Sequence, residues 1–85
     1  MMQRTVKIGA SRYSGRALLM ALMAQRNLEY FERNGFALGS GAIGETKITA
    51  VDADGHELYR VSPPERANAV LVQPPSGDLR LIAVV

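Results

Sequence analysis

Residues 16–33 read RALLMALMAQRNLEYFER, and this stretch decides the expected fold. It contains no glycine or proline, and most of its residues are strong helix formers. The next two residues, Asn34 and Gly35, are a common terminating pair, because both tolerate the left-handed conformation that ends many helices. The sequence therefore predicts one long helix from about Arg16 to Arg33.

The first half of this helix has an unusual composition, since residues 17–24 read ALLMALMA and leave no polar face. A helix that is apolar on all sides must be covered on all sides, whereas one sheet covers only one of them. We therefore expect a second copy of the chain to cover the other side, giving a homodimer or a higher oligomer. The interface residues expected from this argument are Leu19, Met20, Leu22 and Met23.

The segments next to the helix predict a strand on one side and a loop on the other. Residues 4–9 alternate polar and apolar side chains, as a half-buried strand does. Residues 9–15 form a turn-rich link, in which Ser11 or Ser14 is expected to cap the start of the helix. Residues 36–44 are rich in glycine and predict a flexible or tightly turning loop.

The second half of the chain predicts two hairpins. Their strands are residues 46–52 and 57–61, joined by a turn at 52–55, and residues 69–73 and 79–85, joined by a turn at 74–77. Between the hairpins, Ser62-Pro-Pro-Glu65 predicts a short helical turn that ends at about Asn68. The expected fold is therefore α+β, with a mainly antiparallel sheet of four to five strands and one long helix packed across one face.

Size and composition limit the chain to one small domain. With 85 residues there is room for a single core, so residues 1–85 are taken as one domain. The absence of cysteine excludes disulfides and is consistent with a cytoplasmic location. The apolar run at 17–24 is too short to span a membrane, and the basic segment before it is too long for a secretory signal. We expect a soluble cytoplasmic protein without a membrane contact.

Charge is distributed unevenly along the chain. Residues 1–28 carry five basic residues and no acid, so this segment has a charge of +5, whereas the remainder is −3. Within the basic segment, residues 7–16 read KIGASRYSGR and lead from a predicted strand into a helix start, where backbone N–H groups favour anions. The spacing matches neither a Walker loop nor the dinucleotide-binding fingerprint. The candidate ligand-binding residues are Lys7, Ser11, Arg12, Tyr13, Ser14 and Arg16.

The sequence offers little for catalysis. His56 is the only histidine, lies on a predicted turn, and has no nucleophile at a recognisable spacing. One histidine without cysteine cannot supply a usual zinc site, and the pair Asp52 and Asp54 lacks the spacing of a calcium loop. We therefore expect a protein that is not an enzyme and has no metal or cofactor.

Two functions follow from these observations. The first is a non-enzymatic, self-associating binder of an anionic ligand, either a nucleotide-like small molecule or a nucleic-acid backbone. The alternative is a small protein, of the kind that phages and plasmids often encode, that inhibits or adapts a host protein. It would use the apolar helix face, the strand edges and the glycine-rich segment.

Overall fold

The computed structural model describes residues 2–24, 26–61, 67–75 and 80–85. Within these residues the chain forms two helices and nine strands. The helices are α1 (Gly15–Leu22) and α2 (Arg26–Asn34). The strands are β1 (Met2–Gln3), β2 (Thr5–Ile8), β3 (Ser11–Ser14), β4 (Ala37–Leu38), β5 (Ser40–Ile43), β6 (Thr46–Val51), β7 (Arg60–Val61), β8 (Ala69–Gln73) and β9 (Leu81–Val84).

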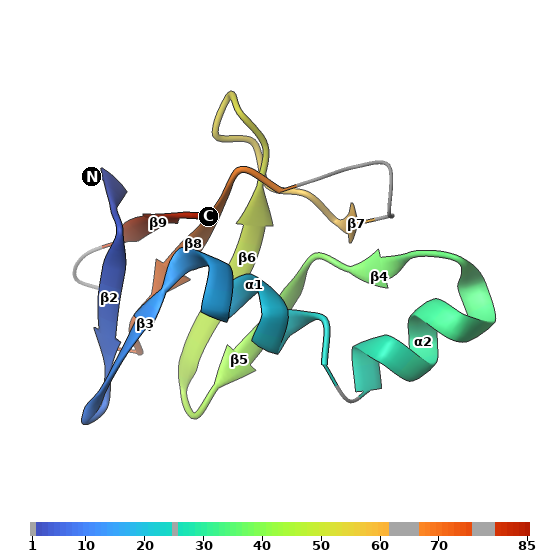
Figure 1. Ribbon diagram of the computed structural model, residues 1–85, viewed down its shortest axis with the longest axis horizontal. Coiled ribbons are helices and arrows are strands. Elements are labelled where there is room, and N and C mark those ends of the chain that lie inside the picture. The colour runs from blue at the N-terminus through green and yellow to red at the C-terminus, as the bar shows by residue number, and fades with distance from the viewer. Residues whose placement is uncertain (1, 25, 62–66, 76–79) are drawn as a thin grey trace.

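Five of the strands form the main sheet, in the order β1-β9-β8-β6-β5 (Figure 1). All neighbouring pairs are antiparallel except β1 with β9, which is parallel, so the sheet is mixed. Two short antiparallel pairs, β2 with β3 and β4 with β7, stand outside it. The α+β class and the mainly antiparallel sheet are confirmed, and the turn expected at residues 52–55 is present, since the N–H of Gly55 donates to the carbonyl of Asp52.

The main core lies on the face of the sheet that α1 and the β2–β3 hairpin cover (Figure 1). Leu18 of α1 and Val6 of β2 are almost fully buried against the sheet residues Ile48, Val70 and Val72. The alternation of side chains along β6 and β8 places Val51, Ala69 and Leu71 on the opposite face, in a smaller cluster with Ile82. Both faces of the central strands are thus apolar.

The expected long helix is wrong, because the chain forms two shorter helices. In a continuous helix the carbonyl of Leu22 would accept from the backbone N–H of Arg26. Here it accepts instead from the side-chain amide of Asn27, at 2.7 Å. Such a side chain competes with the helical backbone for its own hydrogen bonds. Helix α1 therefore ends at Leu22, and α2 starts at Arg26 in a new direction.

The segment expected to be a turn-rich link is a second strand. Gly9 has a φ of 63°, which glycine adopts readily, and it reverses the chain so that β3 pairs with β2. Ser14, the last residue of β3, caps α1, since its Oγ accepts from the N–H of Ala17 at 3.0 Å. Of the two serines expected to cap the helix, Ser14 is the one that does so.

The glycine-rich segment is also more ordered than expected, because it forms β4 and β5 instead of a loop. β4 pairs with β7, which is formed by Arg60 and Val61. Of the predicted return strand 57–61, these two residues therefore pair with β4, and one isolated bridge joins Glu57 to Val51 at the end of β6. The helical turn expected at Ser62-Pro-Pro-Glu65 lies outside the described residues, as does part of the turn at 74–77.

Candidate functional site

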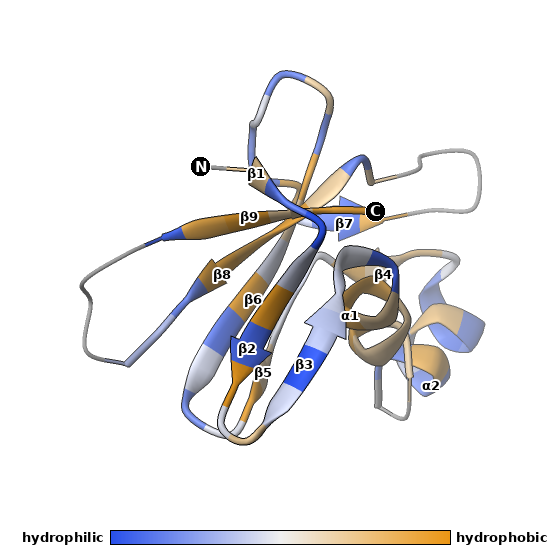
Figure 2. Ribbon diagram, turned by 60° about the vertical axis from the view of Figure 1, so that its left-hand side comes forward, coloured by the Kyte–Doolittle hydropathy of each residue, from blue (hydrophilic) through white to orange (hydrophobic). Residues whose placement is uncertain are grey.

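The β2–β3 hairpin sorts its side chains onto two faces. In the register of the pair, Val6 lies opposite Tyr13 and Lys7 lies opposite Arg12. Val6 is buried, and Tyr13 is half-buried against the main core. Because directly opposite residues share a face and neighbours along a strand alternate, Lys7 and Arg12 project from the outer face. Both are exposed, and Figure 2 shows the two strands β2 and β3 of this hairpin side by side.

Two further cations lie at the open end of the same hairpin. Arg4 precedes β2, and its carbonyl accepts from the N–H of Gly15 at 3.4 Å. Arg16 follows Gly15 in the first turn of α1, which contains no acidic residue. Both arginines are exposed. We call the four residues Arg4, Lys7, Arg12 and Arg16 the basic cluster.

The centre of the basic cluster is electrostatically unfavourable in the free protein. Like charges directly opposite each other in an antiparallel pair repel, and this destabilises the hairpin by a few tenths of a kcal/mol up to about 1 kcal/mol. Neither Lys7 nor Arg12 forms an ion pair with any residue that the structure describes. Among the described residues, the side chains of this pair make one hydrogen bond, a weak one from Nη1 of Arg12 to Oγ1 of Thr5 at 3.4 Å. An anion bound between the two cations would remove the repulsion.

The other residues predicted to bind a ligand, Ser11, Tyr13 and Ser14, lie on the same hairpin but outside the basic cluster. Ser14 lies opposite Thr5 at the open end of the hairpin, where its hydroxyl caps α1. Ser11 lies opposite Ile8 near the turn and is exposed. Tyr13 packs against the core with part of its ring. Arg4 was missed as a site residue, because the site was expected in a loop that follows the strand; only the acid-free N-terminal segment pointed to it.

Replacing Ser14 by alanine separates the capping role from a ligand-binding role. We expect the free energy of unfolding to fall by about 1 kcal/mol, because an N–H at the helix start loses its acceptor. Urea unfolding followed by circular dichroism measures this, with Ser11→Ala as the matched control at about 0.5 kcal/mol or less. An unchanged stability for Ser14→Ala would mean that the cap contributes nothing in solution.

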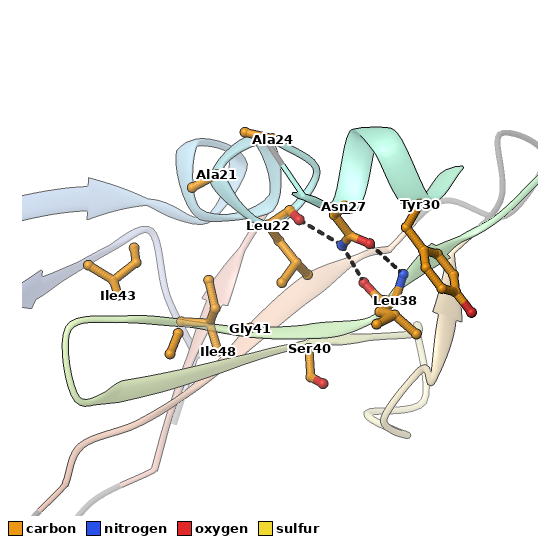
Figure 3. Close-up of a pocket in the computed structure, with 11 residues that line it drawn as sticks. Ala21, Leu22, Ala24, Asn27, Tyr30, Leu38, Ser40, Gly41, Ile43 and Ile48 are labelled. Carbon is orange, nitrogen blue, oxygen red and sulfur yellow. Dashed lines mark hydrogen bonds between the residues drawn. The ribbon is translucent and has the colours of Figure 1, made fainter. Parts of the chain in front are cut away.

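A second concave feature lies between the helices and strands β4 to β6 (Figure 3). This groove has a volume of about 480 Å³ and is lined by Ala21, Leu22, Ala24, Asn27, Tyr30, Leu38, Ser40, Gly41, Ala42, Ile43 and Ile48. Its lining is mostly small or apolar and includes no member of the basic cluster. The helix face, strand edge and glycine-rich segment that the protein-binding alternative requires come together here.

Asn27 holds one end of the groove. Its Nδ2 donates to the carbonyls of Leu22 and Leu38 at 2.7 and 2.8 Å, and its Oδ1 accepts from the N–H of Leu38 at 2.8 Å (Figure 3). One side chain therefore connects the end of α1, the start of α2 and β4. These three bonds use both N–H groups of the amide, which makes Asn27 a structural residue of the groove and leaves its nitrogen no free donor.

The four residues expected at an oligomer interface lie in different environments. Leu22 is 5% exposed and belongs to the core of its own chain, so it is not available to a partner. Leu19 and Met23 are half-buried and pack against that core. Met20 is 65% exposed. Oligomerisation through this helix stays a prediction, with Met20 as the residue of the four that a partner could cover.

The turn at residues 52–56 brings together Asp52, Asp54 and His56, whose potential ligand atoms lie within 4.8 Å of one another. The turn itself accounts for much of this geometry, since Oδ1 of Asp52 accepts from the N–H groups of Asp54 and His56, both at 2.9 Å. Nδ1 of His56 lies 3.7 Å from Oδ2 of Asp52, and the imidazole is exposed. The cluster is a solvent-exposed turn.

Comparisons with protein-family models, with curated proteins and with solved structures found no match. In the part of the chain that the structure describes, neither helix has the length and apolar character needed to cross a membrane.

Proposed function

We propose that this chain is a non-enzymatic protein that binds the phosphodiester backbone of a nucleic acid through the basic cluster. One observation carries the proposal: Lys7 and Arg12 lie directly opposite each other, exposed, without an acidic partner among the described residues. A pair that repels itself in the free protein gains most from an anion held between its members. Arg4 and Arg16 extend the same positive surface toward the start of α1.

The exposure of the cluster favours a polymer over a small nucleotide. Small-molecule sites usually bury most of their ligand in a cavity. The described groove contains none of the four cations, and all four lie exposed on the hairpin or beside it. An extended polyanion can contact several exposed cations at once, and each contact releases counterions from the nucleic acid. Contacts of this kind position a protein on the backbone and carry little sequence information.

Charge reversal at Arg12 tests the proposal. We expect Arg12→Glu to weaken binding to a fluorescently labelled DNA duplex by at least about tenfold at about 0.1 M salt, where the Debye length is about 10 Å, because one phosphate contact is lost and Lys7 gains an intramolecular partner. Fluorescence anisotropy measures the affinity. The matched control is Arg33→Glu, which changes the net charge equally but lies in α2, at the other end of the molecule (Figure 1).

Arg33→Glu should change the affinity by no more than about twofold, since exposed charges beyond a Debye length are largely screened. Equal affinities for wild type and Arg12→Glu would contradict the proposal. Equal losses in the two variants would show that net charge, and not the basic cluster, governs binding. The host-protein alternative predicts no binding to nucleic acid in any of these titrations.

A further inference from the structure

Strand β5 is an open edge of the main sheet. It is the last strand in the sheet order and pairs only with β6. The carbonyl of Gly39 accepts from the N–H of Ala50 at 2.7 Å, whereas its N–H donates to Tyr59, so in the register of the β5–β6 pair it is the carbonyl of Gly39 that points toward β6. Because backbone groups alternate in direction along an antiparallel strand, those of Ser40 and Ala42 point away from the sheet. Two N–H and two carbonyl groups are thus directed at the space that another strand would occupy.

This edge lacks the features that usually prevent strand pairing. Natural edge strands are protected by charged side chains, proline or bulges. β5 reads Ser-Gly-Ala-Ile, has no charge and no proline, and exposes Ser40, Gly41 and Ala42. The surface above it is apolar as well, since Ala21 of α1 and Ala24, two residues after its end, are exposed and Leu38 is 45% exposed at the end of the groove.

The chain exposes more surface than a compact monomer of its mass is expected to expose. A compact monomer of 9.2 kDa is expected to expose about 4,900 Å². This chain exposes 5900 Å². The excess is about 1,000 Å², and each partner in a standard-size interface loses about 800 Å². One further contact of ordinary size would therefore bring the surface to the usual value.

We propose that the occupant of this edge is a second copy of the chain, with the two β5 strands paired antiparallel about a two-fold axis. The two five-stranded sheets would then form one continuous sheet. Gly41 and Ile43 lie on the same face of the sheet as Ile48, the face that α1 covers, so Ile43 of the partner copy would extend the apolar lining of the groove. Both α1 helices would lie on this face, where the exposed Met20 and Ala24 could contact the partner.

An isologous contact of this type is self-complementary and closes as a dimer. The interface differs from the one expected from the sequence, because its centre is the edge of β5 and not the face of the helix that holds Leu22.

Sedimentation equilibrium of the full chain with the variant Ala42→Lys tests this proposal. Wild type is expected to sediment at twice the chain mass of 9.2 kDa over a concentration range of about 1–100 μM, with dissociation at the dilute end. A lysine on the edge opposes pairing, so Ala42→Lys should sediment as a monomer. Its ammonium would lie opposite that of Lys47 in β6, but this repulsion costs at most about 1 kcal/mol, so the circular dichroism spectrum should stay that of a folded chain. Ala53→Lys, an exposed alanine in the turn after β6, is the matched control and should remain dimeric.

Hydrogen exchange provides a second readout that needs no variant. The amide of Ala42 points away from the sheet, so pairing with a second copy should slow its exchange by at least about tenfold at high relative to low protein concentration. A wild-type chain that is monomeric at every concentration would overturn the proposal. A dimer that Ala42→Lys leaves intact, with unprotected Ala42, would overturn it by placing the interface elsewhere.

Discussion

Replacing Gly39 by alanine is expected to lower the free energy of unfolding by at least about 3 kcal/mol. Gly39 is buried where β4 passes into β5, and its backbone lies against that of Leu58. A Cβ atom at this position would overlap the carbonyl group of Leu58, which is backbone and cannot rotate away. The shift needed to relieve the overlap would disturb the bonds from Gly39 to Tyr59 and from Ala50 to Gly39, of 2.9 and 2.7 Å.

Urea unfolding measured by circular dichroism tests this expectation. The matched control is Gly41→Ala, two residues further on in β5, where an added Cβ would meet only the end of the Leu22 side chain, at 2.9 Å. That side chain can adjust, so the control should lose less than about half as much stability. Equal stabilities for wild type and Gly39→Ala would mean that the backbones of Gly39 and Leu58 do not approach each other as described.

Replacing Asn27 by alanine has the second large effect, a loss of about 2–3 kcal/mol of unfolding free energy. The change removes three hydrogen bonds of 2.7 to 2.8 Å and leaves the carbonyl of Leu22 and both backbone groups of Leu38 without their partner. The bond to Leu22 is partly buried, so water replaces it poorly, whereas water reaches the bonds to Leu38 more easily. For a domain of this size the loss lowers the Tm by roughly 10–20 °C.

Thermal unfolding of Asn27→Ala measures this, with Asn34→Ala as the matched control. Asn34 lies in the same helix and makes one exposed bond, from its Nδ2 to the carbonyl of Tyr30 at 2.9 Å. Loss of this bond should change the free energy of unfolding by about 0.5 kcal/mol or less. Similar Tm values for the two variants would contradict the role given to Asn27 as the connection between α1, α2 and β4.

The strands of the sheet were predictable where both hydrophobic pattern and turn residues were clear. Residues 46–51 and 69–73 alternate or run apolar between turn residues, and the structure places β6 and β8 there. The turn at Asp52–Gly55 followed from residue types that favour it. These strands and this turn depend on the residue types of short segments and on the burial of central strands, and both are visible in the hydrophobic pattern of one sequence.

The helix break and the second strand were not predictable from such patterns. No glycine or proline separates α1 from α2; the break depends on the side chain of Asn27 reaching Leu22 and, across 11 residues, Leu38. β3 is a short strand, Ser-Arg-Tyr-Ser, whose single apolar ring is only half-buried, so its alternation is too weak to separate it from a loop. In both cases tertiary contacts decided between two locally acceptable conformations.

The candidate site was located by charge but not by geometry. The acid-free N-terminal segment indicated a positive surface, and Lys7, Arg12 and Arg16 belong to the cluster proposed from the structure. The sequence could not show that Lys7 and Arg12 lie opposite each other, because that depends on the reversal at Gly9 and on the register it sets.

The most direct test of the central proposal is the salt dependence of binding to a short DNA duplex by the intact wild-type chain. If up to four cations contact phosphates, the logarithm of the association constant should fall linearly with the logarithm of the salt concentration, with a slope between about −2 and −4. Arg12→Glu should make this slope shallower by about 1. Absence of binding at low salt, or an affinity that does not depend on salt, would contradict the proposal that the basic cluster binds a phosphodiester backbone.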